Sequence, residues 1–161
     1  MSPLTLLAAG NPAERALSLL ERLPAETRIA VSETPAALRE FAAEADVILD
    51  AWSAPGVLEA VFNLCPRVRW VHSLTAGVEG ILFPALLESP VPLTNSRGVF
   101  SRSLAEFAVA AMLYFAKDFR RMLANQAAGV WDRFDVEEVH GRALGILGFG
   151  EIGRHTARLA T

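Results

Sequence analysis

Short, continuous apolar segments alternate with helical patterns over the first hundred residues of this chain. Five segments read as strands, at residues 4–10, 27–32, 46–52, 68–77 and 91–96. Three stretches between them, at 11–23, 33–45 and 54–65, have the spacing of helices. Strands that are apolar on both faces and alternate with helices indicate a parallel sheet covered on both sides. The pattern therefore predicts an α/β fold, a flavodoxin-like doubly wound domain with strand order 2-1-3-4-5.

A longer helical pattern follows at residues 103–124, where apolar side chains recur at helical spacing. Ser103, with Glu106 three residues later, has the spacing of a capping box. A continuous helix of this length would measure roughly 30 Å, enough to connect two domains or to line a subunit interface. We therefore predict an interdomain or dimerisation helix at 101–125, followed by a polar linker at 126–141.

Three glycines near the end of the sequence, Gly148, Gly150 and Gly153, have the spacing of a dinucleotide-binding turn. The apolar segment ALGIL precedes them and a helical pattern follows, which is the order that opens a Rossmann domain. A plain glycine-rich turn between strand and helix is the alternative. The acidic residue that binds the ribose should come about 20 residues further on, which is beyond Thr161. Residues 142–161 are therefore predicted to be the truncated start of a Rossmann domain, poorly ordered alone or packed on another chain.

Composition excludes several classes of protein. A formal net charge of −3 gives no electrostatic reason to expect nucleic acid or an anionic membrane as a partner. The longest uncharged apolar stretch, 107–116, is far shorter than the roughly 20 residues that cross a bilayer. Cys65 is the only cysteine, so no intramolecular disulfide can form, and a cytoplasmic location is expected. The acidic residues of the linker lack the spacing of metal ligands, and no metal site is predicted.

Three segments carry a resemblance to a known family: VHSLTAGVEGIL, TNSRGVFSRSLAEFAVAAMLYFAKDFRRM and HGRALGILGFGEIG. Together with Trp131 they closely resemble the D-isomer-specific 2-hydroxyacid dehydrogenases, in particular the glyoxylate/hydroxypyruvate reductase and phosphoglycerate dehydrogenase branch. The resemblance covers essentially the whole chain in the right order. It implies a flavodoxin-like substrate domain at residues 1–100, interrupted by an inserted Rossmann domain, with the active site in the cleft between the two. The chain would then correspond to the N-terminal half of such an enzyme.

The resemblance also implies which residues bind the ligands. The substrate would meet Trp52, Thr75, Ala76, Gly77 and Val78, with backbone N–H groups of the 75–78 loop holding its carboxylate. The cofactor, NAD or NADP, would meet Val99, Ser101, Gly148, Gly150, Glu151, Ile152 and Gly153. Within this set, Val99 and Ser101 would lie near the nicotinamide and the others near the diphosphate. Arg97 stands where the family commonly has proline.

The implied activity is hydride transfer between NAD(P)H and a small 2-keto or 2-hydroxy acid. The family's catalytic arginine, histidine and carboxylate come from the half that this chain does not represent. His72, His140 and His155 do not match them, so no catalytic residue is predicted and the chain alone is expected to be inactive. A homodimer through helix 103–124 is expected, with no nucleic-acid or membrane partner.

Alternatives remain open at several positions. Trp52 could equally pack in the core, and Ser101 could be a plain helix-entry residue. A catalytically inert, flavodoxin-like fragment that binds a partner or dimerises is the alternative function. A phosphorylation receiver, with Asp50 as the acceptor, is rejected because the acidic pair after the first strand and the lysine after the fifth are both missing.

Overall fold

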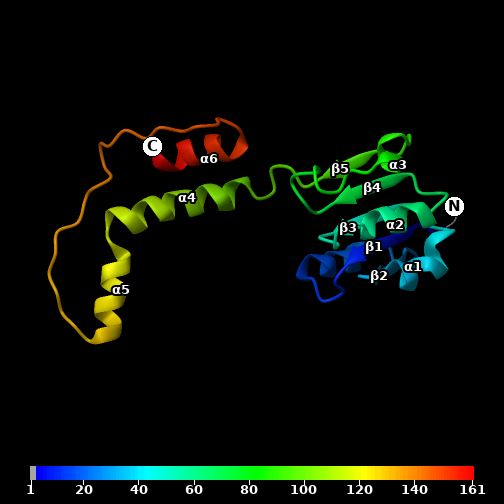
Figure 1. Ribbon diagram of the computed structural model, residues 1–161, viewed down its shortest axis with the longest axis horizontal. Coiled ribbons are helices and arrows are strands. Elements are labelled where there is room, and N and C mark those ends of the chain that lie inside the picture. The colour runs from blue at the N-terminus through cyan, green and yellow to red at the C-terminus, as the bar shows by residue number, and fades with distance from the viewer. Residues whose placement is uncertain (1–2) are drawn as a thin grey trace. The chain divides into compact units, whose positions relative to one another are not determined.

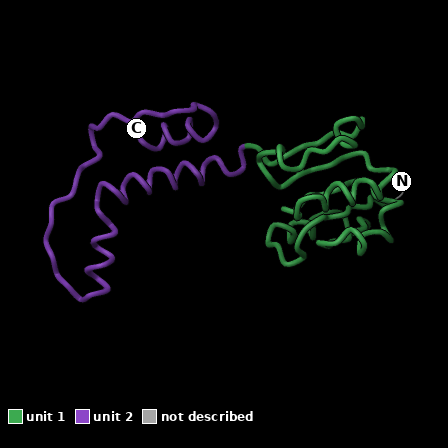
Figure 2. Tube along the Cα trace, in the orientation of Figure 1, with its two compact units in different colours: residues 1–97 green, residues 98–161 purple. Residues whose placement is uncertain are grey.

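A computed structural model describes residues 3–161 of the chain. It consists of two compact units, Met1–Arg97 and Gly98–Thr161, which are coloured separately in Figure 2. The first unit contains the sheet, and the second is built from helices and a long connecting segment.

The first unit is a five-stranded, all-parallel sheet (Figure 1). Its strands are β1 (Thr5–Gly10), β2 (Arg28–Ser32), β3 (Val47–Ala51), β4 (Trp70–Ser73) and β5 (Leu93–Asn95). Their order is β2-β1-β3-β4-β5, which confirms the predicted doubly wound arrangement. β4 and β5 are shorter than predicted because the chain turns into loops after Ser73 and Asn95.

Both faces of the sheet are covered, which explains the continuous apolar runs. Neighbouring side chains of a strand point to opposite faces, so Leu6 and Leu7 belong to different clusters. One cluster contains Leu7, Ile48 and buried residues of α1 (Pro35–Ala42), α2 (Val57–Leu64) and α3 (Pro84–Leu87). The other contains Leu6 and Leu17. Cys65 lies in the first cluster, and burial raises the pKa of its thiol to about 11, so the thiol stays protonated at neutral pH.

The prediction of a helix over residues 11–23 is wrong in type and in length. The structure has a 3-10 helix, η1 (Arg15–Arg22), whose N-cap is Glu14. Upstream of it, the side-chain oxygen of Asn11 accepts a hydrogen bond from the Ala13 N–H at 2.9 Å. That local bond holds residues 11–13 in a turn, and the regular structure begins later.

The second unit contains α4 (Ser101–Ala116), α5 (Phe119–Ala128) and α6 (Glu151–Ala160). The prediction of a single helix over 103–124 is therefore wrong, because the helix is interrupted between Ala116 and Phe119. Asp118 adopts a left-handed backbone with φ 47°, and its carboxylate accepts a hydrogen bond from the Arg121 N–H at 3.3 Å. Aspartate is a strong N-cap residue, and here it starts a second helix inside the apolar pattern.

Two further predictions for this unit are wrong. The Ser103–Glu106 capping box does not form, since α4 begins at Ser101 and its N-cap, Phe100, makes no side-chain cap. Residues 143–147 form no strand, because residues 98–161 offer no neighbouring strand to pair with. α6 nevertheless folds and packs along α4 of the same chain (Figure 1), so it does not need another chain for its partner.

Candidate functional site

The loop that leaves β4 at its carboxyl end, residues 75–78, turns its carbonyl groups toward the protein. Four consecutive carbonyl oxygens accept hydrogen bonds: Thr75 O from the Ser96 N–H at 2.9 Å, Ala76 O from Asn95 Nδ2 at 2.7 Å, Gly77 O from Thr75 Oγ1 at 2.6 Å, and Val78 O from the Ile81 N–H at 3.0 Å. The peptide planes of this loop are thus held in one orientation.

The N–H groups of Ala76, Gly77 and Val78 donate no hydrogen bond to any residue among 3–161. In a trans peptide the N–H points away from the C=O of the preceding residue. Because the preceding carbonyls are each held by the protein, these three N–H groups face the other way. Successive unpaired N–H groups of this kind form a concave site for an anion. The loop is therefore chemically suited to hold a carboxylate, which is the role that the family resemblance implies for it.

A buried carboxylate lies behind the loop. Asp50, on β3, is 1% exposed and pairs in register with Ser73 of β4, and Ser73 pairs with Asn95 of β5. Asp50 Oδ2 accepts a hydrogen bond from Ser73 Oγ at 2.7 Å, and Asp50 Oδ1 accepts one from Ser53 Oγ at 2.7 Å. Sheet register therefore brings three polar residues together at the carboxyl ends of three strands, where ligands bind in open α/β sheets.

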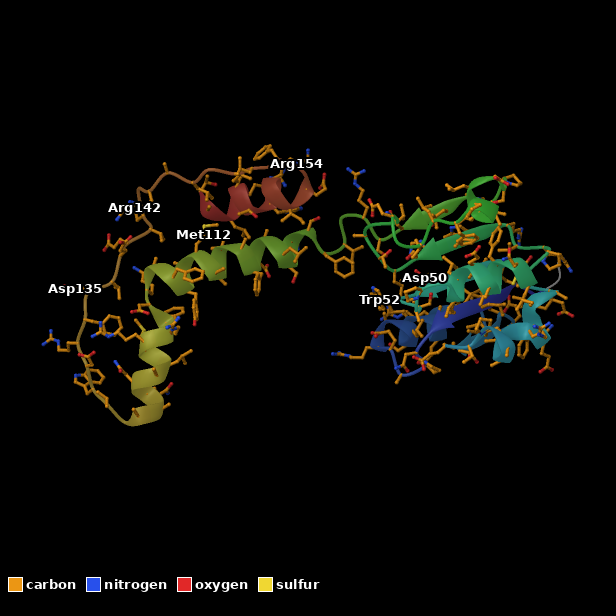
Figure 3. All side chains as sticks on the ribbon, viewed as in Figure 1. Asp50, Trp52, Met112, Asp135, Arg142 and Arg154 are labelled. Atoms are coloured by element: carbon orange, nitrogen blue, oxygen red, sulfur yellow. The ribbon has the colours of Figure 1, made fainter. Side chains whose placement is uncertain are left out.

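Trp52 lies at the same end of the sheet, just after β3, as Figure 3 shows. Its backbone is left-handed, with φ 54°, and its residue surface is 46% exposed. The turn is held by Asp50 Oδ1, which also accepts the Ser53 N–H at 3.2 Å. A non-glycine residue in this conformation costs of order 1–3 kcal/mol and is concentrated at functional sites. The exposed ring argues against core packing and leaves Trp52 available as a wall of a pocket.

The glycine turn before α6 has the geometry that its three glycines predict. Gly148 has a positive φ of 89°, which favours glycine. A Cβ atom at Gly153 would stand 2.5 Å from the carbonyl oxygen of Gly148, so the helix can approach the turn only without a side chain there. A Cβ at Gly150 would meet no atom within 4 Å, and this residue is the N-cap of α6. Space for a ligand is therefore left at the start of the helix.

The remaining predicted cofactor residues lie in the same unit as the glycine turn. Glu151 and Ile152 begin α6, and the carboxylate of Glu151 forms an ion pair with Arg154 one helical turn later. Ser101 is buried at the start of α4, and Val99 is exposed just before it. All predicted substrate residues belong to the first unit and all predicted cofactor residues belong to the second.

The three histidines occupy different settings. His72 is partly buried on β4, and its Nδ1 lies 2.7 Å from Thr94 Oγ1 on β5. His140 lies in the exposed linker, and His155 is half-buried on α6. Residues 3–161 contain no group of three or more His, Cys, Asp and Glu side chains arranged to hold a metal ion.

Sequence reasoning missed the supporting roles of Asp50 and Ser73. The one available signal is an acidic residue inside the apolar strand VILDA, since a carboxylate is buried only with hydrogen-bond partners. Its partners could not be named, because they depend on strand register.

Comparisons with known proteins show what the chain is similar to. Residues 109–161 match the family model for the D-isomer specific 2-hydroxyacid dehydrogenase, NAD binding domain. A D-3-phosphoglycerate dehydrogenase of Methanocaldococcus jannaschii is 29% identical over 149 residues, which are 91% of this chain and 28% of that protein. A D-isomer specific 2-hydroxyacid dehydrogenase family protein of Klebsiella pneumoniae superposes with a TM-score of 0.73 and 26% identity, covering 99% of this chain and 49% of that chain. Residues 109–161 therefore match the NAD-binding domain of the D-isomer-specific 2-hydroxyacid dehydrogenase family, and the chain as a whole has the fold of a solved member of that family.

Within this dehydrogenase family, a further solved relative comes from Sinorhizobium meliloti. It is an NADPH-dependent glyoxylate/hydroxypyruvate reductase in complex with citrate, with a TM-score of 0.76 and 20% identity, and it covers 99% of this chain and 50% of that one. The chain thus spans about half the length of these solved dehydrogenases. The five-stranded sheet corresponds to their substrate-binding half. None of the helices formed by residues 3–161 combines the length and the apolarity needed to cross a membrane.

Proposed function

We propose that this chain supplies the substrate-carboxylate site of a dehydrogenase that interconverts small 2-keto and 2-hydroxy acids with NAD(P)H. The observation that carries the proposal is the loop at 75–78. Its carbonyls are all held by the protein while the N–H groups of Ala76, Gly77 and Val78 are unpaired among residues 3–161. Hydrogen bonds from backbone N–H groups to an anion are stronger than neutral ones, so three of them would orient a carboxylate firmly.

The family relatives support this choice of substrate class. The named activities of relatives include D-3-phosphoglycerate dehydrogenase and glyoxylate reductase, whose substrates all carry a carboxylate. The Sinorhizobium meliloti relative was solved with citrate, which is also a carboxylate. In this chain Trp52 would wall the pocket beside the carboxylate, because its ring is exposed at the same end of the sheet.

The glycine turn fits a dinucleotide. The close approach of Gly153 to Gly148 and the open space at Gly150 are what a diphosphate at a helix N-terminus requires. Residues Gly148, Gly150, Glu151, Ile152 and Gly153 would contact the diphosphate, with Val99 and Ser101 toward the nicotinamide. When bound, the nicotinamide supplies or accepts the hydride. This chain's own residues bind and orient the substrate and the cofactor. No residue among 1–161 is assigned as the general acid or base.

Turnover therefore requires groups that the family carries outside the part matched by this chain. We expect the 161-residue chain to bind glyoxylate without oxidising NADH or NADPH. Absorbance at 340 nm in the presence of glyoxylate or hydroxypyruvate measures the turnover, and calorimetry measures the binding. Steady NADH oxidation by the purified chain would contradict the claim that turnover needs groups outside it. Absence of glyoxylate binding would contradict the assignment of the substrate site. A single cysteine supports a reducing, cytoplasmic setting for this enzyme.

The cofactor assignment predicts a specific loss at Gly150. A Gly150→Val variant is expected to weaken binding of NADH by tenfold or more, because the side chain would fill the space where the diphosphate approaches. Nothing in the protein itself lies within 4 Å of the new Cβ, so the fold should be retained. Gly145→Val is the matched control, since Gly145 is also open but lies outside the glycine motif. Fluorescence of NADH on titration measures both, and equal affinities in the two variants would remove Gly150 from the site.

A second proposed role, the formation of a homodimer, rests on α4. Phe107 and Phe115 are 74% and 79% exposed, which is unusual for large apolar side chains on a helix. We propose that this face forms a homodimer contact, as the sequence suggests for residues 103–124. Sedimentation equilibrium should give a mass near twice 17.4 kDa, and Phe107→Lys together with Phe115→Lys should return it to 17.4 kDa. A monomer for the unmodified chain at all concentrations would contradict the contact.

A further inference from the structure

The carboxylate of Asp50 supports two loops at once. One branch runs from Asp50 Oδ1 to the N–H and hydroxyl of Ser53, which closes the turn at Trp52. The other branch runs from Asp50 Oδ2 to Ser73 Oγ, and from there toward Thr75 at the start of the 75–78 loop. Asp50 and Ser73 are among the most deeply buried side chains of the sheet, so water cannot substitute for the contact between them.

The second branch has a defined direction. A carboxylate only accepts hydrogen bonds, so the single hydroxyl proton of Ser73 is directed to Asp50. A lone pair of Ser73 Oγ then remains for the Thr75 N–H, which donates to it at 3.2 Å. Asp50 therefore makes Ser73 an acceptor toward the loop, and the Thr75 N–H is drawn inward.

The position of Thr75 sets the rest of the loop. Thr75 Oγ1 lies 2.6 Å from the Gly77 carbonyl oxygen, to which it donates, and the Thr75 carbonyl accepts the Ser96 N–H at 2.9 Å. If Thr75 were free to turn, the Gly77 carbonyl would lose its partner and the following peptide could rotate. The N–H of Val78 would then no longer face outward.

We propose that Asp50 is a positioning residue for the carboxylate-binding loop and that it acts through Ser73. The role rests on the proposed function for its ligand, since the loop is the substrate-carboxylate site. Asp50 does not touch the substrate: it fixes the acceptor that anchors Thr75, and so keeps three N–H groups aimed at the ligand.

Two variants separate this role from a general loss of stability. Ser73→Ala cuts the branch to the loop, and Ser53→Ala cuts the side-chain bond of the other branch to the same carboxylate. In proton–nitrogen NMR spectra of the ligand-free chain, Ser73→Ala should shift or broaden the amide signals of residues 75–78. Ser53→Ala should instead affect residues 52–54 and leave 75–78 in place. Equal effects of both variants on 75–78, or no effect of Ser73→Ala there, would overturn the proposal.

The same variants are then titrated with glyoxylate. Ser73→Ala should raise the dissociation constant about fivefold or more, as expected from the loss of one well-aligned hydrogen bond, and Ser53→Ala by less than about twofold. Asp50→Ala should match Ser73→Ala at residues 75–78 and in affinity, and should also affect residues 52–54 because it cuts both branches, while Asp50→Asn should restore both amide signals and affinity. An asparagine can accept from Ser53 and donate to Ser73 Oγ, which still has a lone pair for the Thr75 N–H. Failure of Asp50→Asn to restore the loop signals in a folded variant would contradict the relay through Ser73.

The response of the unmodified chain to glyoxylate tests the proposed function separately from the role of Asp50. If the unmodified chain does not respond to glyoxylate, the substrate assignment fails. The spectra without ligand still decide whether Asp50 and Ser73 hold the loop. If Asp50→Ala does not fold, the comparison of Ser73→Ala with Ser53→Ala decides alone.

Discussion

An Ala76→Pro variant is expected to lose at least tenfold in affinity for glyoxylate. Proline has no N–H, so one of the three donors of the 75–78 loop is deleted, and a hydrogen bond to a charged group is worth about 1.5–3 kcal/mol. The ring also restricts Thr75 to extended conformations, which disturbs the anchor of the loop. Calorimetric titration of the folded variant with glyoxylate measures the loss.

Gly77→Ala is the matched control for this loop. It keeps every N–H, and the new Cβ would meet only the end of the flexible Glu79 side chain, at 2.7 Å, which can move aside. Its affinity for glyoxylate should stay within about twofold of the unmodified chain. Unchanged binding in Ala76→Pro would remove the loop from the substrate site, and equal losses in both variants would indicate general damage to the loop.

A Leu7→Ala variant is expected to lower the free energy of unfolding of the first unit by about 2–5 kcal/mol. Leu7 is fully buried on β1, the second strand of the sheet, and truncation removes apolar contacts and leaves a cavity. Urea unfolding followed by tryptophan fluorescence measures the loss. A Trp131→Phe background confines the signal to Trp52 and Trp70, both in the first unit.

Leu87→Ala provides the control, because Leu87 lies on α3 with 65% of its residue surface exposed. It should cost less than about 0.5 kcal/mol, as is usual for a surface substitution away from the core. A loss in Leu7→Ala no greater than in Leu87→Ala would contradict a sheet buried on both faces.

The sheet could be predicted because its signal is local in the sequence. β1 and β3 are buried along their whole length, so every residue of TLLAAG and VILDA faces a covered side. Such runs, separated by helical patterns, leave few alternatives to a parallel sheet. The strand order then follows from the doubly wound arrangement that the pattern suggests.

The errors arose where one polar side chain or a missing neighbour decides the structure. Asp118 interrupts an apolar pattern that continues on both sides of it, and a periodicity argument gives one residue little weight. Residues 143–147 have the composition of a strand, but a strand exists only with a partner, and residues 98–161 contain no other strand. Asn11 holds a local turn at the start of the predicted helix.

The candidate site was reached in part from the sequence. The family resemblance pointed to the 75–78 loop, and the structure adds the hydrogen-bond donors that hold its carbonyls. Two of those donors come from Asn95 and Ser96, some twenty residues further along, and the buried support comes from Asp50. Their proximity depends on the register of β3, β4 and β5, which no local pattern of residues contains.

The most direct test of the substrate site is a proton–nitrogen NMR titration of the unmodified chain with glyoxylate. The three unpaired N–H groups of Ala76, Gly77 and Val78 should show the largest shifts, all saturating with one dissociation constant. Glycolaldehyde, which has the aldehyde but no carboxylate, should leave them in place. Shifts confined to other residues, or equal shifts with glycolaldehyde, would contradict a carboxylate site at this loop.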